Sequence, residues 1–192
     1  MNTLKRLAVY CGSATGNRPL FADCARATAQ AMVGAGVDLV YGGGRLGLMG
    51  IVADSVLAGG GRVYGVIPDA LVELEVAHTG ITELHTVTTM HQRKAKMTDL
   101  ADAFLALPGG IGTLDELFEA WSWNVLGYHA KPFCLLNVDG FWDGLIEFID
   151  HATSSGFMSE QRRKQLLVAN TPGHALELLD EAAAAATQGM VW

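Results

Sequence analysis

Short, continuous apolar runs alternate with longer amphipathic stretches along the whole 192-residue chain. The run Ala103-Phe104-Leu105-Ala106-Leu107 is typical, because it has no polar residue on either face. Strands of this kind are buried on both sides, as in a parallel sheet covered by helices. The alternation therefore predicts an α/β fold, a three-layer, doubly wound parallel sheet of about seven strands in a single domain spanning residues 1–192.

Each apolar run is assigned to a strand and each amphipathic stretch to a helix. Strands are expected near residues 6–11, 37–41, 62–67, 83–87, 103–107, 133–137 and 166–168. Helices are expected over residues 19–35, 46–58, 89–101, 113–126, 141–154, 159–165 and 172–186. Residues 69–80 form the longest stretch expected to be irregular.

Charge and cysteine content exclude several classes of protein. The net charge of −7 argues against nucleic acid as a partner, because that binding uses a basic face. Three cysteines without CxxC spacing indicate neither a disulfide framework nor a zinc site and fit a reducing, cytoplasmic location. No stretch approaches ~20 apolar residues, and the N-terminal run is too short for a signal peptide, so no membrane partner is expected.

Glycines gather in three loops that each follow a predicted strand and precede a helix, at residues 11–13, 42–44 and 108–113. Ligands of open α/β sheets bind at this edge. Amides exposed at residues 108–113, together with the helix dipole, make an anion site. The Gly-Lys-Ser/Thr ending of a P-loop is absent, which argues against triphosphate chemistry.

Residues 42–47 satisfy G-x-G-x-x-G, and Asp69 lies about twenty residues further on, as a ribose-binding acid would. The motif follows the second predicted strand rather than the first. Dinucleotide binding, a tight turn without a ligand, and contact with a mononucleotide phosphate are all compatible with it.

Two charged segments each allow a structural and a functional interpretation. The segment Thr113-Leu114-Asp115-Glu116 is compatible with a capping box, or Glu116 is a carboxylate beside an anion site. Arg93 and Lys94 follow Thr89, a plausible N-cap, so they would lie where the helix dipole disfavours cations. They belong either to a solvated face or to a pair with an anionic ligand or a carboxylate.

Other reactive residues lack the context that their chemistry needs. The histidines at positions 78, 85 and 91 lack metal-ligand spacing, so no metal is expected. Ser13 and Ser122 lack a G-x-S-x-G context. Trp121, Trp123, Phe141 and Trp142 could stack on a base, but aromatic residues at such spacings more often pack in a core.

The segment Pro108-Gly109-Gly110-Ile111-Gly112-Thr113-Leu114-Asp115-Glu116 fits the PGGxGTxxE signature of the LONELY GUY family at every fixed position. These are cytokinin-activating phosphoribohydrolases, long mislabelled as lysine decarboxylases. Further similar stretches follow in the family's order, at residues 9–13, 38–44, 47–50, 65–68, 90–94 and 136–140. The resemblance runs from about residue 6 to about residue 180.

The resemblance implies a Rossmann-like fold, a homodimer, and hydrolysis of N6-modified adenosine 5′-monophosphates, with AMP as a further candidate, to free base and ribose 5-phosphate. It implies no metal or organic cofactor. Arg93 and Glu116 correspond to the catalytic pair. The candidate substrate-binding residues are Ser13, Gly43, Gly44, Glu75, Met90, Lys94, Gly109, Gly110, Ile111, Gly112, Thr113 and Asp115.

The chain departs from the family pattern in two places. Residues 69–80 lack the usual Pro-Arg-Glu, so the match of Glu75 rests on position alone. Asp115 stands where glutamate is frequent, and Ile111 where tyrosine is frequent. These changes bear on base preference rather than on the chemistry.

Two other functions remain to be weighed. A non-catalytic nucleotide carrier or sensor of the same fold would share every loop described above. An amino-acid decarboxylase would need a lysine in a pyridoxal-binding setting, and neither Lys94 nor Lys131 has one.

Overall fold

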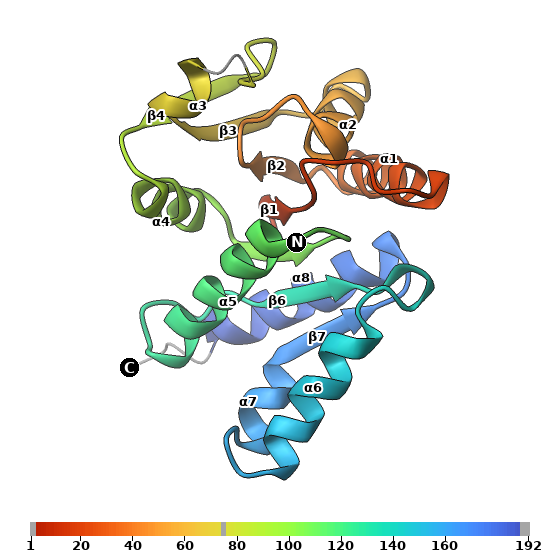
Figure 1. Cartoon of the computed structure of the whole chain (residues 1–192), viewed down its shortest axis with the longest axis vertical. Helices are drawn as coiled ribbons and strands as arrows, with labels where there is room; N and C mark the ends of the chain where they lie inside the picture. The colour runs from red at the N-terminus through yellow and green to blue at the C-terminus, as the bar shows by residue number, and fades with distance from the viewer. Residues whose placement is uncertain (1–2, 74–75, 189–192) are drawn as a thin grey trace.

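The computed structural model describes residues 3–73 and 76–188, which contain a seven-stranded parallel sheet (Figure 1). Its order is β4-β3-β2-β1-β5-β6-β7. The strands are β1 (Arg6–Tyr10), β2 (Asp38–Tyr41), β3 (Val63–Pro68), β4 (Glu83–Val87), β5 (Ala103–Ala106), β6 (Phe133–Leu136) and β7 (Leu166–Ala169). The chain moves outward from β1 to β4 and then returns to the other side of β1 with β5. This reversal makes the β1/β5 boundary the switch point at which doubly wound sheets bind ligands.

Helices cover both faces of the sheet. They are α1 (Pro19–Gly34), α2 (Gly47–Ala58), α3 (Asp69–Glu73), α4 (Met90–Leu100), α5 (Ile111–Val125), α6 (Asp143–Ser154), α7 (Glu160–Gln165) and α8 (Pro172–Gln188), with a 3₁₀ turn, η1 (Val138–Gly140), before α6. Buried residues of α1, α2 and α8 form one core with one face of the sheet. Buried residues of α4, α5 and α6 form a second core with the other face.

Strand β1 shows why its sequence is apolar without interruption. Leu7 and Val9 enter the first core, whereas Ala8 and Tyr10 enter the second. Successive side chains of a strand point to opposite faces, so a strand between two helical layers needs apolar residues at every position. The predicted fold class, a three-layer α/β protein with a parallel sheet, is confirmed.

Three local predictions need correction. Residues 69–80, expected to be irregular, begin with the short helix α3. The helix expected to begin at Thr113 begins at Ile111, because Gly110 is already its extended N-cap. The helix expected from residue 141 begins at Asp143, after the 3₁₀ turn. None of these changes alters the order of the sheet.

Backbone hydrogen bonds join the glycine loops at the carboxyl edge of the sheet. The Gly12 amide donates to the Pro108 carbonyl (3.2 Å), and the Leu48 amide donates to the Gly12 carbonyl (3.0 Å). Gly43 accepts a hydrogen bond from the His78 amide (2.8 Å). These hydrogen bonds connect the loops that follow β1, β2, β3 and β5 into one rim at this edge of the sheet. None of the helices in the described ranges is long and apolar enough to cross a membrane.

Gly47 sets how closely this rim packs. It has a φ of +61°, and an added Cβ would lie 2.2 Å from the Ser13 carbonyl carbon. We expect Gly47→Ala to lower the free energy of unfolding by about 3 kcal/mol or more, because left-handed strain adds to a backbone collision. Gly60→Ala is the control, since its φ of +82° is similar but nothing lies within 4 Å. It should lose only about 1–2 kcal/mol in urea unfolding, and equal losses would contradict the steric argument.

Candidate functional site

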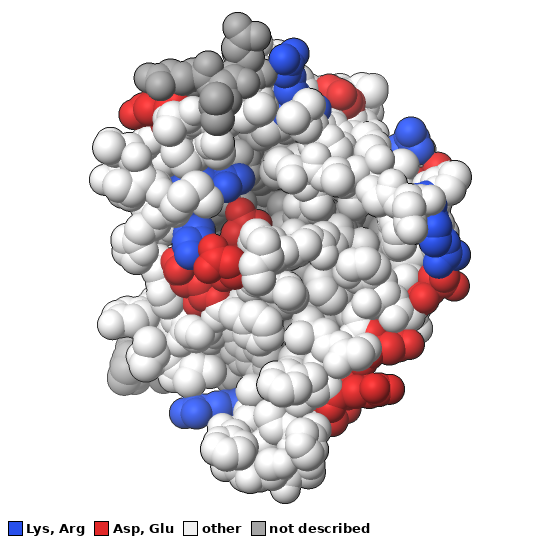
Figure 2. All heavy atoms as spheres, viewed as in Figure 1, with Lys and Arg blue, Asp and Glu red and all other residues white. Residues whose placement is uncertain are grey.

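A cavity of about 540 Å³ opens at the carboxyl edge of the sheet, next to the switch point. Its polar wall comes from the glycine loops and from two charged side chains: Gly12, Ser13, Gly42, Gly44, Gly110, Gly112, Thr113, Arg93 and Glu116. Its apolar wall comes from Cys11, Leu46, Met49, Ile67, Leu71, Ile111 and Val76. Figure 2 shows acidic and basic atoms gathered beside a hollow on this face of the molecule. The volume is sufficient for a small organic ligand.

Arg93 reaches the cavity from the first turns of α4. Thr89 and Gln92 form a capping box that fixes where this helix begins. The guanidinium, whose residue is only 7% exposed, donates from Nε to the Val66 carbonyl (3.1 Å) and from Nη2 to the Gly42 carbonyl (3.0 Å). Charge-assisted bonds of this kind offset the cost of a cation near a helix N-terminus. The interpretation of Arg93 as part of a solvated face is therefore wrong.

Gly42 leaves the space that this guanidinium fills. A Cβ at position 42 would lie 1.7 Å from Nη2 of Arg93. A side chain there would displace the guanidinium from its two carbonyl acceptors. The second glycine loop thus has a role in the site beyond forming a turn.

Glu116 faces Arg93 from α5, with 3.7 Å between its Oε1 and Nη2 of Arg93. The capping-box interpretation of residues 113–116 is wrong, because α5 begins at Ile111 and Thr113 is already inside the helix. Burial raises the pKa of Glu116 to about 7, although nearby Arg93 opposes the shift. A carboxyl group that titrates near neutrality suits general acid or base catalysis.

The first turn of α5 forms the opposite side of the cavity. The amides of Ile111, Gly112 and Thr113 have no acceptor within the helix, and the helix dipole adds positive potential there. Gly109 allows the loop to close on the buried Thr113, since a Cβ at position 109 would lie 2.1 Å from Oγ1 of Thr113. The free amides and the helix dipole give this end of the cavity the chemistry to hold an anion.

Within the described residues, the remaining predicted site residues surround the cavity rather than line it. Lys94 forms ion pairs with Asp115 (3.0 Å) and with Glu119. Met90 is half-exposed at the start of α4, and Nη1 of Arg93 lies 3.9 Å from its sulfur. Gly43, with a φ of +73°, shapes the turn between Gly42 and Gly44. Glu75 lies outside the described residues.

The Lys94 amine is unsuited to a Schiff base. Burial alone would lower its pKa, but hydrogen bonds to Glu119 and Asp115 outweigh burial and raise the pKa above its ordinary value. A protonated, ion-paired amine is not a nucleophile. The geometry therefore offers no support for amino-acid decarboxylation at Lys94.

Sequence reasoning missed the apolar wall of the cavity. Met49, Ile67, Leu71 and Val76 line it, yet each resembles an ordinary core residue in the sequence. Cys11 also lines the cavity, but burial raises its thiol pKa well above the usual range, which disfavours the thiolate form that a nucleophile needs. Leu71 and Val76 come from the segment around α3, where the sequence carried no recognisable motif.

The fold and the site place this chain in the class of Rossmann-like α/β proteins. Two solved structures share the fold. They are the molybdenum cofactor binding protein of Rippkaea orientalis (TM-score 0.70, 20% identity, covering 92% of this chain and 96% of that one) and the molybdenum cofactor carrier protein of Chlamydomonas reinhardtii (0.71, 18%, 94% and 98%).

The sequence comparisons identify the family. A family model described as "Possible lysine decarboxylase" matches residues 49–179. Cytokinin riboside 5′-monophosphate phosphoribohydrolase LOG2 of Arabidopsis thaliana is 48% identical over 92% of this chain and 83% of its own length. The rice enzyme LOG is 47% identical over 98% of this chain and 78% of its own length. The chain belongs to the LOG family, as its motifs predicted.

The raised pKa of Glu116 predicts how stability depends on pH. The folded protein keeps the Glu116 proton up to about pH 7, whereas the unfolded chain releases it near 4.5. The contribution of this group to stability therefore falls as pH rises through that interval. We expect the stability of Glu116→Gln relative to the unsubstituted protein to increase by about 2–3 kcal/mol between pH 5 and pH 8.

Urea unfolding at both pH values measures this difference. The exposed Glu147, which lines neither wall of the cavity, provides Glu147→Gln as the control, and its relative stability should stay constant. A flat pH dependence for Glu116→Gln would mean that the carboxylate is not destabilised by burial.

Proposed function

We propose that this chain hydrolyses the N-glycosidic bond of N6-modified adenosine 5′-monophosphates, and of AMP, to free base and ribose 5-phosphate. The observation that carries the proposal is the buried Glu116, paired with Arg93 and set beside a backbone anion site. Relatives at 47–48% identity bear the name cytokinin riboside 5′-monophosphate phosphoribohydrolase. The proposal combines that family membership with the chemistry of this cavity.

The 5′-phosphate binds at the glycine loops in this scheme. The amides of residues 110–113, at the N-terminus of α5, donate hydrogen bonds to the phosphate oxygens. The phosphate-binding site is completed from the neighbouring loops by Gly43, Gly44 and the hydroxyl of Ser13. Anchoring at the phosphate fixes the position of the ribose and lets binding energy orient the anomeric carbon against Glu116.

Glu116 acts on the ribose when the base leaves. As the bond from C1′ to the base nitrogen breaks, its electron pair goes to the base, which takes up a proton from solvent, and positive charge develops on the sugar ring. The carboxylate stabilises that charge and accepts a proton from the attacking water, whose oxygen bonds to C1′. The proton that Glu116 gains in the reaction returns to solvent at the end of the turnover. Arg93 holds Glu116 in place and keeps a fraction of it ionised at neutral pH.

The base occupies the apolar wall in the same scheme. Met49, Ile67, Leu71 and Val76 give a planar base and an N6 substituent a surface without competing charges. Lys94 and Asp115, together with Met90 and Glu75, belong to the outer substrate-binding residues. Neither metal nor organic cofactor takes part in this proposal.

A nucleotide carrier or sensor is the alternative, and the fold does not separate it from an enzyme. The solved structures that share the fold include a carrier protein, but identity below 25% relates them by fold alone. A buried carboxyl with a pKa near 7 is costly for a protein that only binds. This cost favours catalysis.

Incubation with isopentenyladenosine 5′-monophosphate and with AMP distinguishes the two functions. We expect free base and ribose 5-phosphate to appear in equal amounts, measured by chromatography, because one bond is hydrolysed per turnover. Stoichiometric binding of nucleotide without release of base would establish a carrier and overturn the proposal.

Removal of the Glu116 carboxylate should reduce turnover while leaving the fold intact. We expect Glu116→Gln to lower kcat by about 10²-fold or more, as for loss of an acid/base group, and Arg93→Ala to have a similar effect. In the unsubstituted protein kcat/KM should rise with pH up to about 7, since the ionised form of Glu116 is the active one. Glu147→Gln is again the control, and near-normal turnover of Glu116→Gln would refute the assignment.

We further propose that the protein is a cytoplasmic homodimer. The thiols of Cys11, Cys24 and Cys134 are free and buried, which fits a reducing compartment. Tyr128, 75% exposed, packs edge-on against Trp123, which in turn contacts His91. An aromatic cluster that carries an exposed tyrosine fits a subunit interface.

Substitution of the exposed tyrosine tests the dimer. Tyr128→Asp should shift the protein from dimer to monomer in sedimentation velocity, because it places a charge in an apolar interface. Phe148→Asp, also at an exposed aromatic residue but on α6, should leave the dimer intact. A monomeric unsubstituted protein would contradict the proposal.

A further inference from the structure

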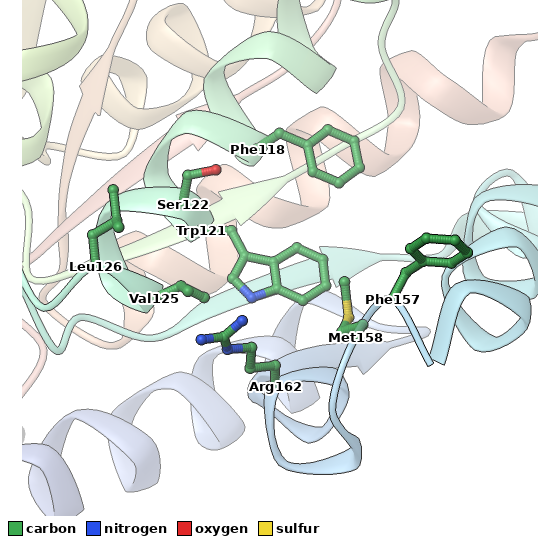
Figure 3. Close-up of a pocket in the computed structure, with 8 residues that line it drawn as sticks. All are labelled: Phe118, Trp121, Ser122, Val125, Leu126, Phe157, Met158 and Arg162. Atoms are coloured by element: carbon green, nitrogen blue, oxygen red, sulfur yellow. The ribbon is translucent and has the colours of Figure 1, made fainter. Parts of the chain in front are cut away.

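A second cavity, of about 380 Å³, lies away from the nucleotide site, between α5 and the segment that joins α6 to α7 (Figure 3). Six of its eight lining residues are apolar, and the other two are Ser122 and Arg162. The apolar residues are Phe118, Trp121, Val125, Leu126, Phe157 and Met158. It shares no lining residue with the first cavity.

The indole nitrogen of Trp121 is an unsatisfied donor in this pocket. Trp121 is only 3% exposed, and its Nε1 has no hydrogen-bond partner in the described part of the chain. Leaving a buried donor unpaired costs about 1–3 kcal/mol. Buried polar groups of native structures almost always bond to protein, to a ligand or to ordered water, so this N–H calls for an acceptor.

Arg162 brings a second donor to the same place. Figure 3 shows its guanidinium beside the indole nitrogen of Trp121, at the edge of the pocket. Its neighbour Arg163 pairs with Asp150, whereas no acidic group among the described residues forms an ion pair with Arg162. Both facing groups donate, so neither satisfies the other.

We propose that this pocket binds a small organic acid with an apolar body, either aromatic or branched. A carboxylate has the acceptor oxygens that an indole N–H and a guanidinium both lack. Arg162 is exposed, so its side chain is free to swing outward and admit the carboxylate. The apolar body then covers Phe118, Val125 and Met158 and shields Phe157, which is 90% exposed.

The carboxylate distinguishes this ligand from one that is only apolar. An uncharged lipid would cover the apolar wall but leave Arg162 and Trp121 as two unpaired donors. A nucleotide would bring a charge too large and too hydrated for a pocket with one cation. The combination of one guanidinium, one indole N–H, the Ser122 hydroxyl and an apolar wall fits one carboxylate.

Calorimetric titration of the full-length chain with 4-phenylbutyrate tests the proposal. We expect saturable binding of one molecule per chain, and binding at least about tenfold weaker for 4-phenylbutyramide, which keeps the shape but lacks the charge. Saturation of the first cavity with AMP, using the Glu116→Gln variant so that no nucleotide is consumed, should leave the affinity for the acid unchanged.

Substitutions then assign the two donors. Arg162→Gln, at an exposed position where folding is not at risk, should weaken binding about tenfold or more, and Trp121→Phe should weaken it about fivefold through loss of one hydrogen bond. Lys164→Gln, on the same helix but outside the pocket, is the matched control and should bind normally.

Four results would overturn the proposal. They are absence of binding at millimolar acid, equal affinity for acid and amide, normal binding by Arg162→Gln, and competition by AMP. Sedimentation of the same samples adds a fifth: if the acid dissociates a dimer, a second copy of the chain is the occupant of this pocket.

Discussion

The buried contact between Arg93 and Glu116 is the interaction on which the site depends. Neither charge is stable alone in an apolar environment. Arg93 is stabilised by the carbonyl groups of Gly42 and Val66, and Glu116 keeps a pKa of about 7 even with that cation nearby. The pair therefore holds a carboxyl group that changes its ionisation at neutral pH, in a wall of the cavity where water is scarce.

The architecture supplies this pair from opposite sides of the switch point. Arg93 comes from α4, which follows β4 at one edge of the sheet. Glu116 comes from α5, which follows β5 on the other side of β1. The parallel sheet places both helix N-termini at one edge, and the reversal of strand order opens a crevice there. The same edge gathers the glycine loops, so an anion site and an acid/base group meet without a metal-binding cluster in the described residues.

Much of the site was predictable because its parts are local. The segment from Pro108 to Glu116 shows an anion loop and a carboxylate in the sequence, since both lie within one turn and the helix that follows. The capping-box alternative for Glu116 failed because Gly110, not Thr113, caps the helix. Helix boundaries depend on how the preceding loop packs, here Gly109 against Thr113, and that packing is not visible in residue types alone.

By itself the sequence determined the α/β class, the order of elements, the family and the catalytic candidates, because periodicity and loop chemistry are properties of short segments. Only the tertiary structure decided that Gly42 makes room for Arg93, that Leu71 and Val76 line the cavity, and that Trp121 and Arg162 face one another in a second pocket. Those contacts join residues far apart in the chain. Their energies come from burial and exclusion of water, which exist only once the layers have packed.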